Sequence, residues 1–346
     1  MRALKYLAAL QIPAAVVLSF WLPGWWSFFA VFFVYGLIPI ADQLLPKTEA
    51  NMSQAEEAVA RAEPLYDVML YLFVPLQVGI LVAYLYAMAS GLWSPVEMVG
   101  GTLAMGISSA VLGINLAHEL GHRTTRFERG LAKALLLTTL NTHFIVEHNL
   151  GHHRRVATPE DPATGRSGES VYRFVVRSMI NSYRSAWFIE RERRGKRQLA
   201  FWSVRNEMLQ LTAIQAMALV VVGAVFGPFG LLAYVLNGLL GHVQLEVINY
   251  IEHYGLTREK RDDGRYERVQ AHHSWNSNHA LGRLVLFELT RHSDHHYMAS
   301  RPYQVLRSLD HAPQMPAGYP AMMLLSLVPP VWFRVMDPRA ERALAE

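Results

Sequence analysis

The stretch MLQLTAIQAMALVVVGAVFGPFGLLAYVLNGLLGHVQLEVINYI, residues 208–251, decides the fold. It consists of two apolar runs, 208–226 and 228–251, separated by Gly227. Each run is close to the roughly 20 residues that an α-helix needs to cross the hydrocarbon core of a bilayer. Four similar runs precede this stretch, so we expect six transmembrane helices, at residues 6–22, 25–41, 68–89, 98–117, 208–226 and 228–251.

The composition of the 346-residue chain agrees with a membrane protein. Hydrophobic residues make up 52% and charged residues only 17%, against about 25% charged residues in an average soluble protein. The chain has no cysteine, which excludes disulfide scaffolds, thiolate zinc sites, iron–sulfur clusters and thiol nucleophiles from it. The net charge of +4 points to no particular partner, and we expect no nucleic acid among them.

The distribution of basic residues predicts the orientation in the membrane. Residues 123–206 contain half of the 32 lysines and arginines but only 7 acidic residues. The short connections near residues 23, 90 and 227 carry a single charge, Glu97. By the positive-inside rule the long basic connection is cytoplasmic, and six spans then place both termini on that side.

We therefore expect an all-α membrane protein, a single integral-membrane domain over residues 1–346, in which six transmembrane helices carry a cytoplasmic helical cap. The catalytic cytoplasmic segments are residues 118–206 and 252–320. The last segment, 321–346, includes an apolar stretch at 322–336 that is too short to span and is interrupted by Pro329 and Pro330. We interpret it as interfacial or as a lid packed on the domain.

Histidine clusters point to the chemistry of the cap. Most of the 15 histidines, none of which precedes His118, fall in the four groups HELGH (118–122), EHNLGHH (147–153), NYIEHYG (249–255) and RHSDHH (291–296). Residues at i and i+4 share a helix face, so the pairs 118/122, 148/152 and 292/296 can each present two imidazoles to one ion. Nine histidines exceed the ligands of one metal, so two ions are implied. Imidazole suits zinc, copper, iron and nickel alike.

Three other interpretations of these histidines are weaker. HELGH satisfies the HExxH pattern of zinc metalloproteases, but such a site would leave seven clustered histidines unexplained. A carboxylate-bridged diiron bundle needs two Glu-x-x-His motifs and two more glutamates, and only Glu119 and His122 have that spacing. A metal transporter or sensor would need polar residues along several spans, whereas here they concentrate at one end.

The motifs HELGH, EHNLGHH, NYIEHYGL and LTRHSDHH resemble, in this order, the histidine boxes and the HYG signature of integral-membrane alkane 1-monooxygenases. The wider group includes xylene monooxygenase and the membrane fatty-acid desaturases and hydroxylases. The resemblance extends from the first spans to about residue 300. Arg123 and Thr290 depart from the usual Lys and Gln of these motifs, and neither is a candidate ligand.

The resemblance implies a diiron enzyme of the bacterial inner membrane that uses O2 and two electrons to convert medium-chain n-alkanes to 1-alkanols. The alternative within the same group is desaturation, or hydroxylation of a fatty acyl chain or an aromatic methyl group. The implied iron ligands are the nine clustered histidines, namely His118, His122, His148, His152, His153, His253, His292, His295 and His296.

The resemblance also implies that electrons arrive from rubredoxin, which an NADH-dependent reductase reduces. We expect no haem, flavin or nicotinamide in this chain, which has no Gly-x-Gly-x-x-Gly fingerprint. A basic cytoplasmic surface could steer an acidic rubredoxin or meet anionic lipid headgroups. The arginines considered for it are Arg154, Arg155, Arg191, Arg193, Arg194 and Arg197.

Several polar residues lie next to the candidate ligands. We expect Glu119, Glu147, Glu252 and Asp294 to orient imidazoles by hydrogen bonding, unless they are ordinary loop charges. His242, Glu246, Asn249 and His253 share one helix face, and we expect Glu246 and Asn249 to form hydrogen bonds around the metals, with a helix–helix contact as the alternative. The roles of His242, His272, His273 and His279 stay open, and His143 and His311 are interpreted as core histidines.

The alkane should reach the metals from the bilayer, where it partitions. We expect an apolar channel among the first four spans, with helix packing as the alternative role of its small residues. The residues considered for this channel are Gly100, Gly101, Gly106, Trp25, Trp26 and Tyr35.

Overall fold

The structure, a computed structural model, describes residues 2–345, and this range is helical without a β-strand. The expected all-α fold class is therefore confirmed. The α-helices are α1 (Gln11–Trp21), α2 (Phe29–Phe32), α3 (Ile38–Leu44), α4 (Gln54–Ala62), α5 (Leu65–Ser90), α6 (Pro95–Ser108), α7 (Asn115–Gly121), α8 (Arg126–Thr138), α9 (Phe144–Glu147), α10 (His153–Arg155), α11 (Val171–Lys196), α12 (Glu207–His253), α13 (Ala280–Val285), α14 (His292–Tyr297), α15 (Tyr319–Ser326) and α16 (Pro329–Ala345). Short 3-10 segments are η1 (Arg2–Leu10), η2 (Gly24–Phe28), η6 (Ala271–His273) and η7 (Tyr303–Val305).

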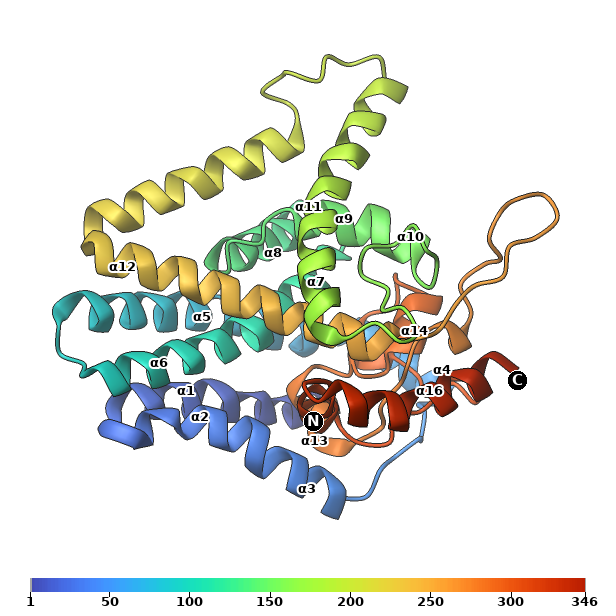
Figure 1. Cartoon of the computed structure of the whole chain (residues 1–346), viewed down its shortest axis with the longest axis horizontal. Coiled ribbons are helices and arrows are strands. Elements are labelled where there is room, and N and C mark those ends of the chain that lie inside the picture. The colour runs from blue at the N-terminus through green and yellow to red at the C-terminus, as the bar shows by residue number, and fades with distance from the viewer. Residues whose placement is uncertain (1, 346) are drawn as a thin grey trace.

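Five continuous helical segments are long and apolar enough to cross a membrane: Arg2–Trp21, Gly24–Leu44, Leu65–Ser90, Pro95–Gly121 and Glu207–His253. Helices α15 and α16 meet the same criterion only as a pair, with a bend of 120° between them. Figure 1 shows the long helices lying alongside one another, with α11 crossing them at one end. The fold thus offers five to six candidate spans.

The longest helix, α12, is a hairpin of two arms, residues 207–226 and 228–253. Gly227 has φ 68° and ψ −170°, a backbone conformation that is essentially restricted to glycine. Pro228 follows it and has no N–H to continue the helical ladder. Figure 1 shows the two arms folding back at this point, where the sequence predicts a break between two spans.

Three of the helices contain π-helical turns: η3 (Phe33–Leu37), η4 (Ser109–Ile114) and η5 (His148–His152). η4 joins α6 to α7, and its first residue is fixed by the Ser109 hydroxyl, which donates to Asn237 Oδ1 on α12 at 2.7 Å. A π turn adds a residue to the helix and rotates everything beyond it. The turn therefore sets the direction in which α7 presents its histidines.

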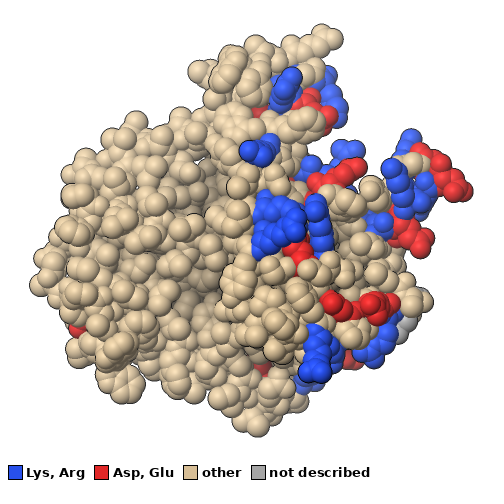
Figure 2. All heavy atoms as spheres, in the orientation of Figure 1, with Lys and Arg blue, Asp and Glu red and all other residues tan. Residues whose placement is uncertain are grey.

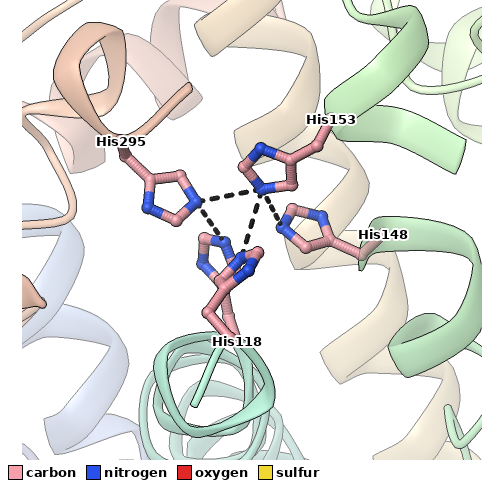
Figure 3. Close-up of side chains that lie close together, drawn as sticks. His118, His148, His153 and His295 are labelled. Atoms are coloured by element: carbon pink, nitrogen blue, oxygen red, sulfur yellow. Dashed lines mark hydrogen bonds between the residues drawn. The ribbon is translucent and has the colours of Figure 1, made fainter. Parts of the chain in front are cut away.

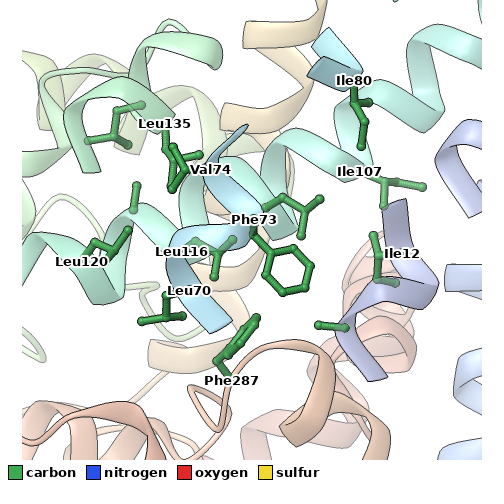
Figure 4. Packing of buried hydrophobic residues seen from close by; sticks show 14 of the residues in the cluster. Ile12, Leu70, Phe73, Val74, Ile80, Ile107, Leu116, Leu120, Leu135 and Phe287 are labelled. Atoms are coloured by element: carbon green, nitrogen blue, oxygen red, sulfur yellow. The ribbon is translucent and has the colours of Figure 1, made fainter. Parts of the chain in front are cut away.

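A continuous apolar core joins the bundle to the cap (Figure 4). Ile12, Phe73 and Leu116 come from three different spanning segments, and Phe287 reaches the same cluster from the connection after α13. Phe287 is fully buried, stacks on Tyr6 at 5.6 Å between ring centroids and has a positive φ of 53°. Burial of this ring fixes the segment that leads into α14.

The C-terminal helices cover the end of α12. Trp332 of α16 is fully buried, with its ring 5.1 Å from Tyr250 and 5.3 Å from Tyr254 between centroids. The hydroxyl of Tyr254 donates to Asp337 at 2.5 Å, and Asp337, like Trp332, belongs to α16. Of the two interpretations of the apolar stretch 322–336, these contacts favour a lid packed on the domain.

Charged residues gather at one end of the molecule. Figure 2 shows lysines, arginines and acids over the end that carries α10, α14 and α16, while the surface of the half formed by the long helices is almost free of charge. The exposed side chains on that half are apolar, for example Val220 and Phe229 on α12. This division matches a bundle that lies in a bilayer with a polar cap outside it.

We expect Gly227→Ala to destabilise the α12 hairpin by about 1 to 3 kcal/mol, because alanine is strained at this φ and ψ. Gly223→Ala is the matched control, since Gly223 is helical and an added Cβ would have Leu231 Cδ2 as its nearest neighbour, at an ordinary 3.5 Å. Thermal unfolding in detergent measures both variants. A Tm for Gly227→Ala equal to that of the control would contradict the assigned backbone strain.

Candidate metal centre

Nine histidines from four parts of the chain meet at the polar end of the bundle. They come from the C-terminus of α7, from η5 and α10, from the last residue of α12, and from α14. Their potential ligand nitrogens form two groups, each with all nitrogens within 4.8 Å of one another. The first group is His118, His122, His148, His153 and His295, and the second is His152, His253, His292 and His296.

In the first group the Nε2 atoms converge on one point (Figure 3). His153 Nε2 lies 2.9 Å from that of His148, 3.1 Å from that of His122 and 3.2 Å from that of His295. A neutral imidazole has one N–H and one lone pair, so one nitrogen cannot form three such hydrogen bonds. A cation that accepts the lone pairs accounts for the convergence, and the donor set therefore fits a metal ion.

The second group is more completely buried than the first and adjoins it. His292 Nε2 lies 3.1 Å from His253 Nε2. Within the described residues, His152 Nε2 and both ring nitrogens of His296 are buried without a hydrogen-bond partner. Such unpaired polar atoms are costly in a protein interior. The His296 ring stacks on that of His153 at 4.4 Å between centroids, so the two histidine groups are in direct contact.

The structure divides the pair His148 and His152 between the two groups, contrary to the expectation from their spacing. The reason is the π turn η5, which spans both residues. In a π-helix the hydrogen bond runs from i to i+5 instead of i+4, which brings His153 to the side of His148 and directs His152 elsewhere. The other two pairs, 118/122 and 292/296, each stay within one group.

Burial favours the neutral form of most of these imidazoles; at His152 burial also lowers the pKa, but the carboxylate of Asp161 raises it more. Burial, together with the nearby His152, lowers the pKa of His122 to about 4. The pKa values of His153, His295 and His296 are likewise well below the ordinary value, first because of burial and then because of neighbouring histidines. Neutral imidazole with a free lone pair is the form that binds a metal.

Asp161, which was not among the predicted residues, bonds to one of the clustered histidines. Its Oδ2 lies 2.9 Å from His152 Nδ1 and also accepts a hydrogen bond from the Thr164 hydroxyl at 2.6 Å. Burial raises the Asp161 pKa, but His152 and Thr164 lower it more, so the group is a carboxylate at neutral pH. A carboxylate at Nδ1 directs Nε2 toward a metal and increases its basicity.

Three of the acidic neighbours of the ligands contact arginines instead of imidazoles. Their contacts are Glu119 Oε1 to Arg123 Nη2 at 2.9 Å, Glu147 Oε1 to Arg155 Nη2 at 2.7 Å, and Asp294 to Arg301 Nη1 at 2.6 and 2.7 Å. Successive residues on a helix point about 100° apart, so an acid beside a ligand faces away from it. These ion pairs hold the backbone segments that carry the histidines.

Glu252 is the one of the four predicted acidic neighbours for which the structure shows a contact with a candidate ligand. Its Oε2 lies 3.3 Å from His292 Nε2, the nitrogen that faces His253. The Tyr319 hydroxyl donates to its Oε1 at 2.7 Å. Glu252 therefore lies on the metal side of the second group, beside the ring nitrogens of His253 and His292.

Glu246 and Asn249 form a buried polar chain on the last arm of α12. The Asn249 amide donates to Glu246 Oε2 at 3.2 Å, and His242 Nε2 lies 3.3 Å from Glu246 Oε1. These residues line a small cavity together with His148 and His152. They surround the candidate metal site without touching its ligand nitrogens.

The remaining histidines have other surroundings. Glu267, His272 and His273 form a third group, but His273 Nδ1 accepts a hydrogen bond from the Gln270 amide, so its Nε2 carries the hydrogen and has no lone pair for a metal. His279 Nδ1 pairs with the Ser277 hydroxyl.

The interpretation of His143 and His311 as core histidines holds for only one of them. His143 is buried against Tyr183, with 5.2 Å between the ring centroids. His311 is exposed, so its interpretation as a core residue was wrong. It lies in the connection before α15, and no apolar periodicity in the sequence there indicates a buried position.

Two adjoining apolar cavities lead to the histidines. The inner one is lined by His118, His148 and His292, and the outer one by residues of α1, η3 and α15. Both are lined by Ala110, Ile248, Leu286 and Tyr319. The shared lining residues place the two cavities next to each other, between the first spans and the candidate metal site.

Of the residues considered for this route, Tyr35 lines it and the others do not. Trp25 and Trp26 are exposed at the far end of the bundle. A Cβ on Gly106 would lie 2.8 Å from Leu240 Cβ, so this glycine permits close approach of two helices. An added Cβ on Gly100 would likewise clash with Ser27, and one on Gly101 would clash with Trp93, so these glycines also permit close packing.

Comparisons with known proteins agree with this arrangement. The family model "Fatty acid desaturase" matches residues 93–326. The chain is 41% identical to an alkane 1-monooxygenase of Pseudomonas putida, covering 94% of this chain and 82% of the relative, and 40% identical to one of Ectopseudomonas oleovorans, covering 97% and 85%. It is 26% identical to the hydroxylase component of a xylene/toluene monooxygenase of Pseudomonas putida, covering 97% and 88%.

We expect Asp161→Asn to weaken metal binding by the second group about 10- to 100-fold, because the variant loses the carboxylate that orients His152. Glu160→Gln is the control, since Glu160 is exposed and adjacent in sequence. Metal per chain, measured after dialysis against a chelator, should fall in the first variant alone. Equal metal retention in both would show that Asp161 does not support a ligand.

Proposed function

The chain belongs to the alkane 1-monooxygenase family, and on that premise we propose that it hydroxylates the terminal methyl group of medium-chain n-alkanes to 1-alkanols. One observation carries this proposal: an apolar cavity between the spanning helices ends at two groups of buried histidines. An alkane has no polar group for recognition, so a shaped apolar cavity that reaches the reacting atoms must select it.

We propose that the nine histidines hold two iron ions, which would supply the activation of O2. The overall reaction consumes the alkane, O2, two electrons and two protons, and yields the alkanol and water. The chain's own residues position the ligands: Asp161 holds His152 through Nδ1, and Glu252 lies on the metal side of His292. The apolar lining excludes bulk water from the substrate's methyl group.

Hydroxylation of a fatty acyl chain or an aromatic methyl group is the alternative within this group of enzymes. A free fatty acid would require a cation for its carboxylate. The described lining of the two cavities contains no lysine or arginine, and its polar members are histidines, amides, Tyr35, Tyr319 and Glu252. This lining favours an uncharged hydrocarbon.

We propose rubredoxin as the electron donor and the cytoplasm as the side from which it docks. The charged end of the molecule in Figure 2 is also the end that contains the histidines, which supports this orientation. Of the six arginines considered for docking, Arg154, Arg191 and Arg197 are exposed. Arg154 directly follows His153, so it is the best placed of the three to position a donor near the metals.

The remaining three arginines are occupied within the protein. Arg155 pairs with Glu147, and Arg193 pairs with Glu190 and Glu207. Arg194 is buried and donates to the carbonyl oxygens of Ala200 and Arg205. Their positive charge is compensated or enclosed, so they contribute little to steering a partner.

The protein purified in detergent should contain about two iron ions per chain, one for each histidine group. With rubredoxin, its reductase and NADH, it should convert octane to 1-octanol. Metal analysis and product identification on the same preparation test both parts. A single zinc ion without oxygenation would contradict the proposal, and an unsaturated product would replace hydroxylation by desaturation.

Narrowing the route should reduce octane hydroxylation without loss of iron. Ile248→Trp places a large ring where the two cavities meet, and we expect at least a tenfold lower rate, about 1.4 kcal/mol in the barrier. Leu239→Trp is the control, because Leu239 lies on the same helix and is exposed. If both variants retain the wild-type rate, the cavities are not the substrate route.

A further inference from the structure

Helix α11 has an apolar stripe that is largely exposed. Other parts of the chain touch some of its members, since the Tyr172 hydroxyl donates to Leu327 O and Tyr183 packs on His143. The stripe repeats at helical spacing over residues 172–187 of this 26-residue helix. Val176 is 60% exposed and Ile180 48% exposed, so much of each apolar side chain is accessible to the surroundings of the helix. The members of the stripe are Tyr172, Val176, Ile180, Tyr183 and the partly exposed Trp187.

A row of arginines runs beside this stripe. Arg173, Arg184 and Arg191 are exposed and recur at spacings of 11 and 7 residues, which places them on one line of the helix surface. Among the residues that the structure describes, no carboxylate lies within salt-bridge distance of these three. The other arginines of α11 differ, since Arg177 pairs with Glu169 and Arg193 with Glu190.

The opposite face of α11 packs on the segments that carry the candidate ligands. Phe174 is fully buried against Tyr250 of α12, with 5.3 Å between the ring centroids. The Ser185 hydroxyl donates to Glu147 Oε1 at 3.1 Å, and Glu147 immediately precedes η5. One side of α11 therefore supports the metal centre while the other is free.

The orientation of α11 indicates what surrounds its exposed side. Figure 1 shows α11 running across the direction of the long helices, at the boundary between the uncharged half and the charged end seen in Figure 2. The connection to α12 continues the same surface with the exposed side chains Leu199, Trp202 and Val204. Tryptophan beside basic residues is typical of a membrane–water interface.

We propose that α11 lies in the plane of the membrane interface, with its apolar stripe among the acyl chains and its arginine row bound to anionic phospholipid headgroups. A helix of 26 residues covers about 39 Å of the surface. An amphipathic helix with a basic edge binds such an interface through apolar burial and charge together. The cap is thereby attached to the bilayer beside the spans that carry it.

Single cysteines test the position of the stripe, because the chain has none of its own. Ile180→Cys and its neighbour Asn181→Cys are both exposed and point about 100° apart on α11. With a nitroxide on the full-length protein in nanodiscs, the ratio of accessibility to molecular oxygen over chromium oxalate should be several-fold higher at Ile180. Equal, water-like ratios at both positions would overturn the proposal.

The same labels distinguish lipid from a second copy of the chain. If another copy covered the stripe, the label at Ile180 would be shielded from both reagents, and dipolar broadening between two labels would appear. That result would also overturn the proposal. Either contrary result would leave the iron and octane measurements unaffected. A failure of the proposal for α11 can therefore be distinguished from a failure of the proposed function.

The arginine row is tested by lipid retention. The triple variant Arg173→Gln, Arg184→Gln and Arg191→Gln, in nanodiscs of phosphatidylcholine and phosphatidylglycerol, should retain several-fold less phosphatidylglycerol per chain than the wild type. The control removes the same charge from an exposed loop, through Lys260→Gln, Arg261→Gln and Arg265→Gln. An equal loss in both variants would show that net charge, and not the row on α11, attracts the lipid.

Discussion

The convergence of neutral imidazole lone pairs in a dry interior is the constraint on which the rest of the structure depends. Nine histidines from four segments direct ring nitrogens at one another, more closely than hydrogen bonds between neutral imidazoles can satisfy. Without a cation this arrangement would leave buried acceptors unsatisfied. Those segments are held in position by the bundle, by the apolar core under α14 and by the ion pairs that Glu119, Glu147 and Asp294 form with arginines.

Much of this architecture could be predicted from the sequence because it depends on composition at the scale of whole helices. The run 68–89 predicts a helix that the structure places at Leu65–Ser90, and Gly227 before Pro228 predicts the break in α12. The gathering of nine histidines could also be predicted, since their motifs all lie near one end of apolar segments.

The finer arrangement could not be predicted, and the reasons are local. A π turn leaves no mark in the spacing of His148 and His152, so their division between two groups was not foreseen. Asp161 lies nine residues beyond His152 in a loop, and no periodicity relates the two. Adjacency in sequence suggested Glu119 and Asp294 as partners of imidazoles, whereas helix geometry turns them toward arginines.

The confinement of charged residues to one end of the molecule, seen in Figure 2, also affects how the chain can insert into the membrane. The turns at the uncharged end are short, and the one acidic residue there, Glu97, already accepts hydrogen bonds from the Gly24 and Ser94 amides. Inserting the bundle as helical hairpins therefore moves almost no charge through the hydrocarbon layer. The polar cap, with all of its histidines, can complete its folding after the spans are in place.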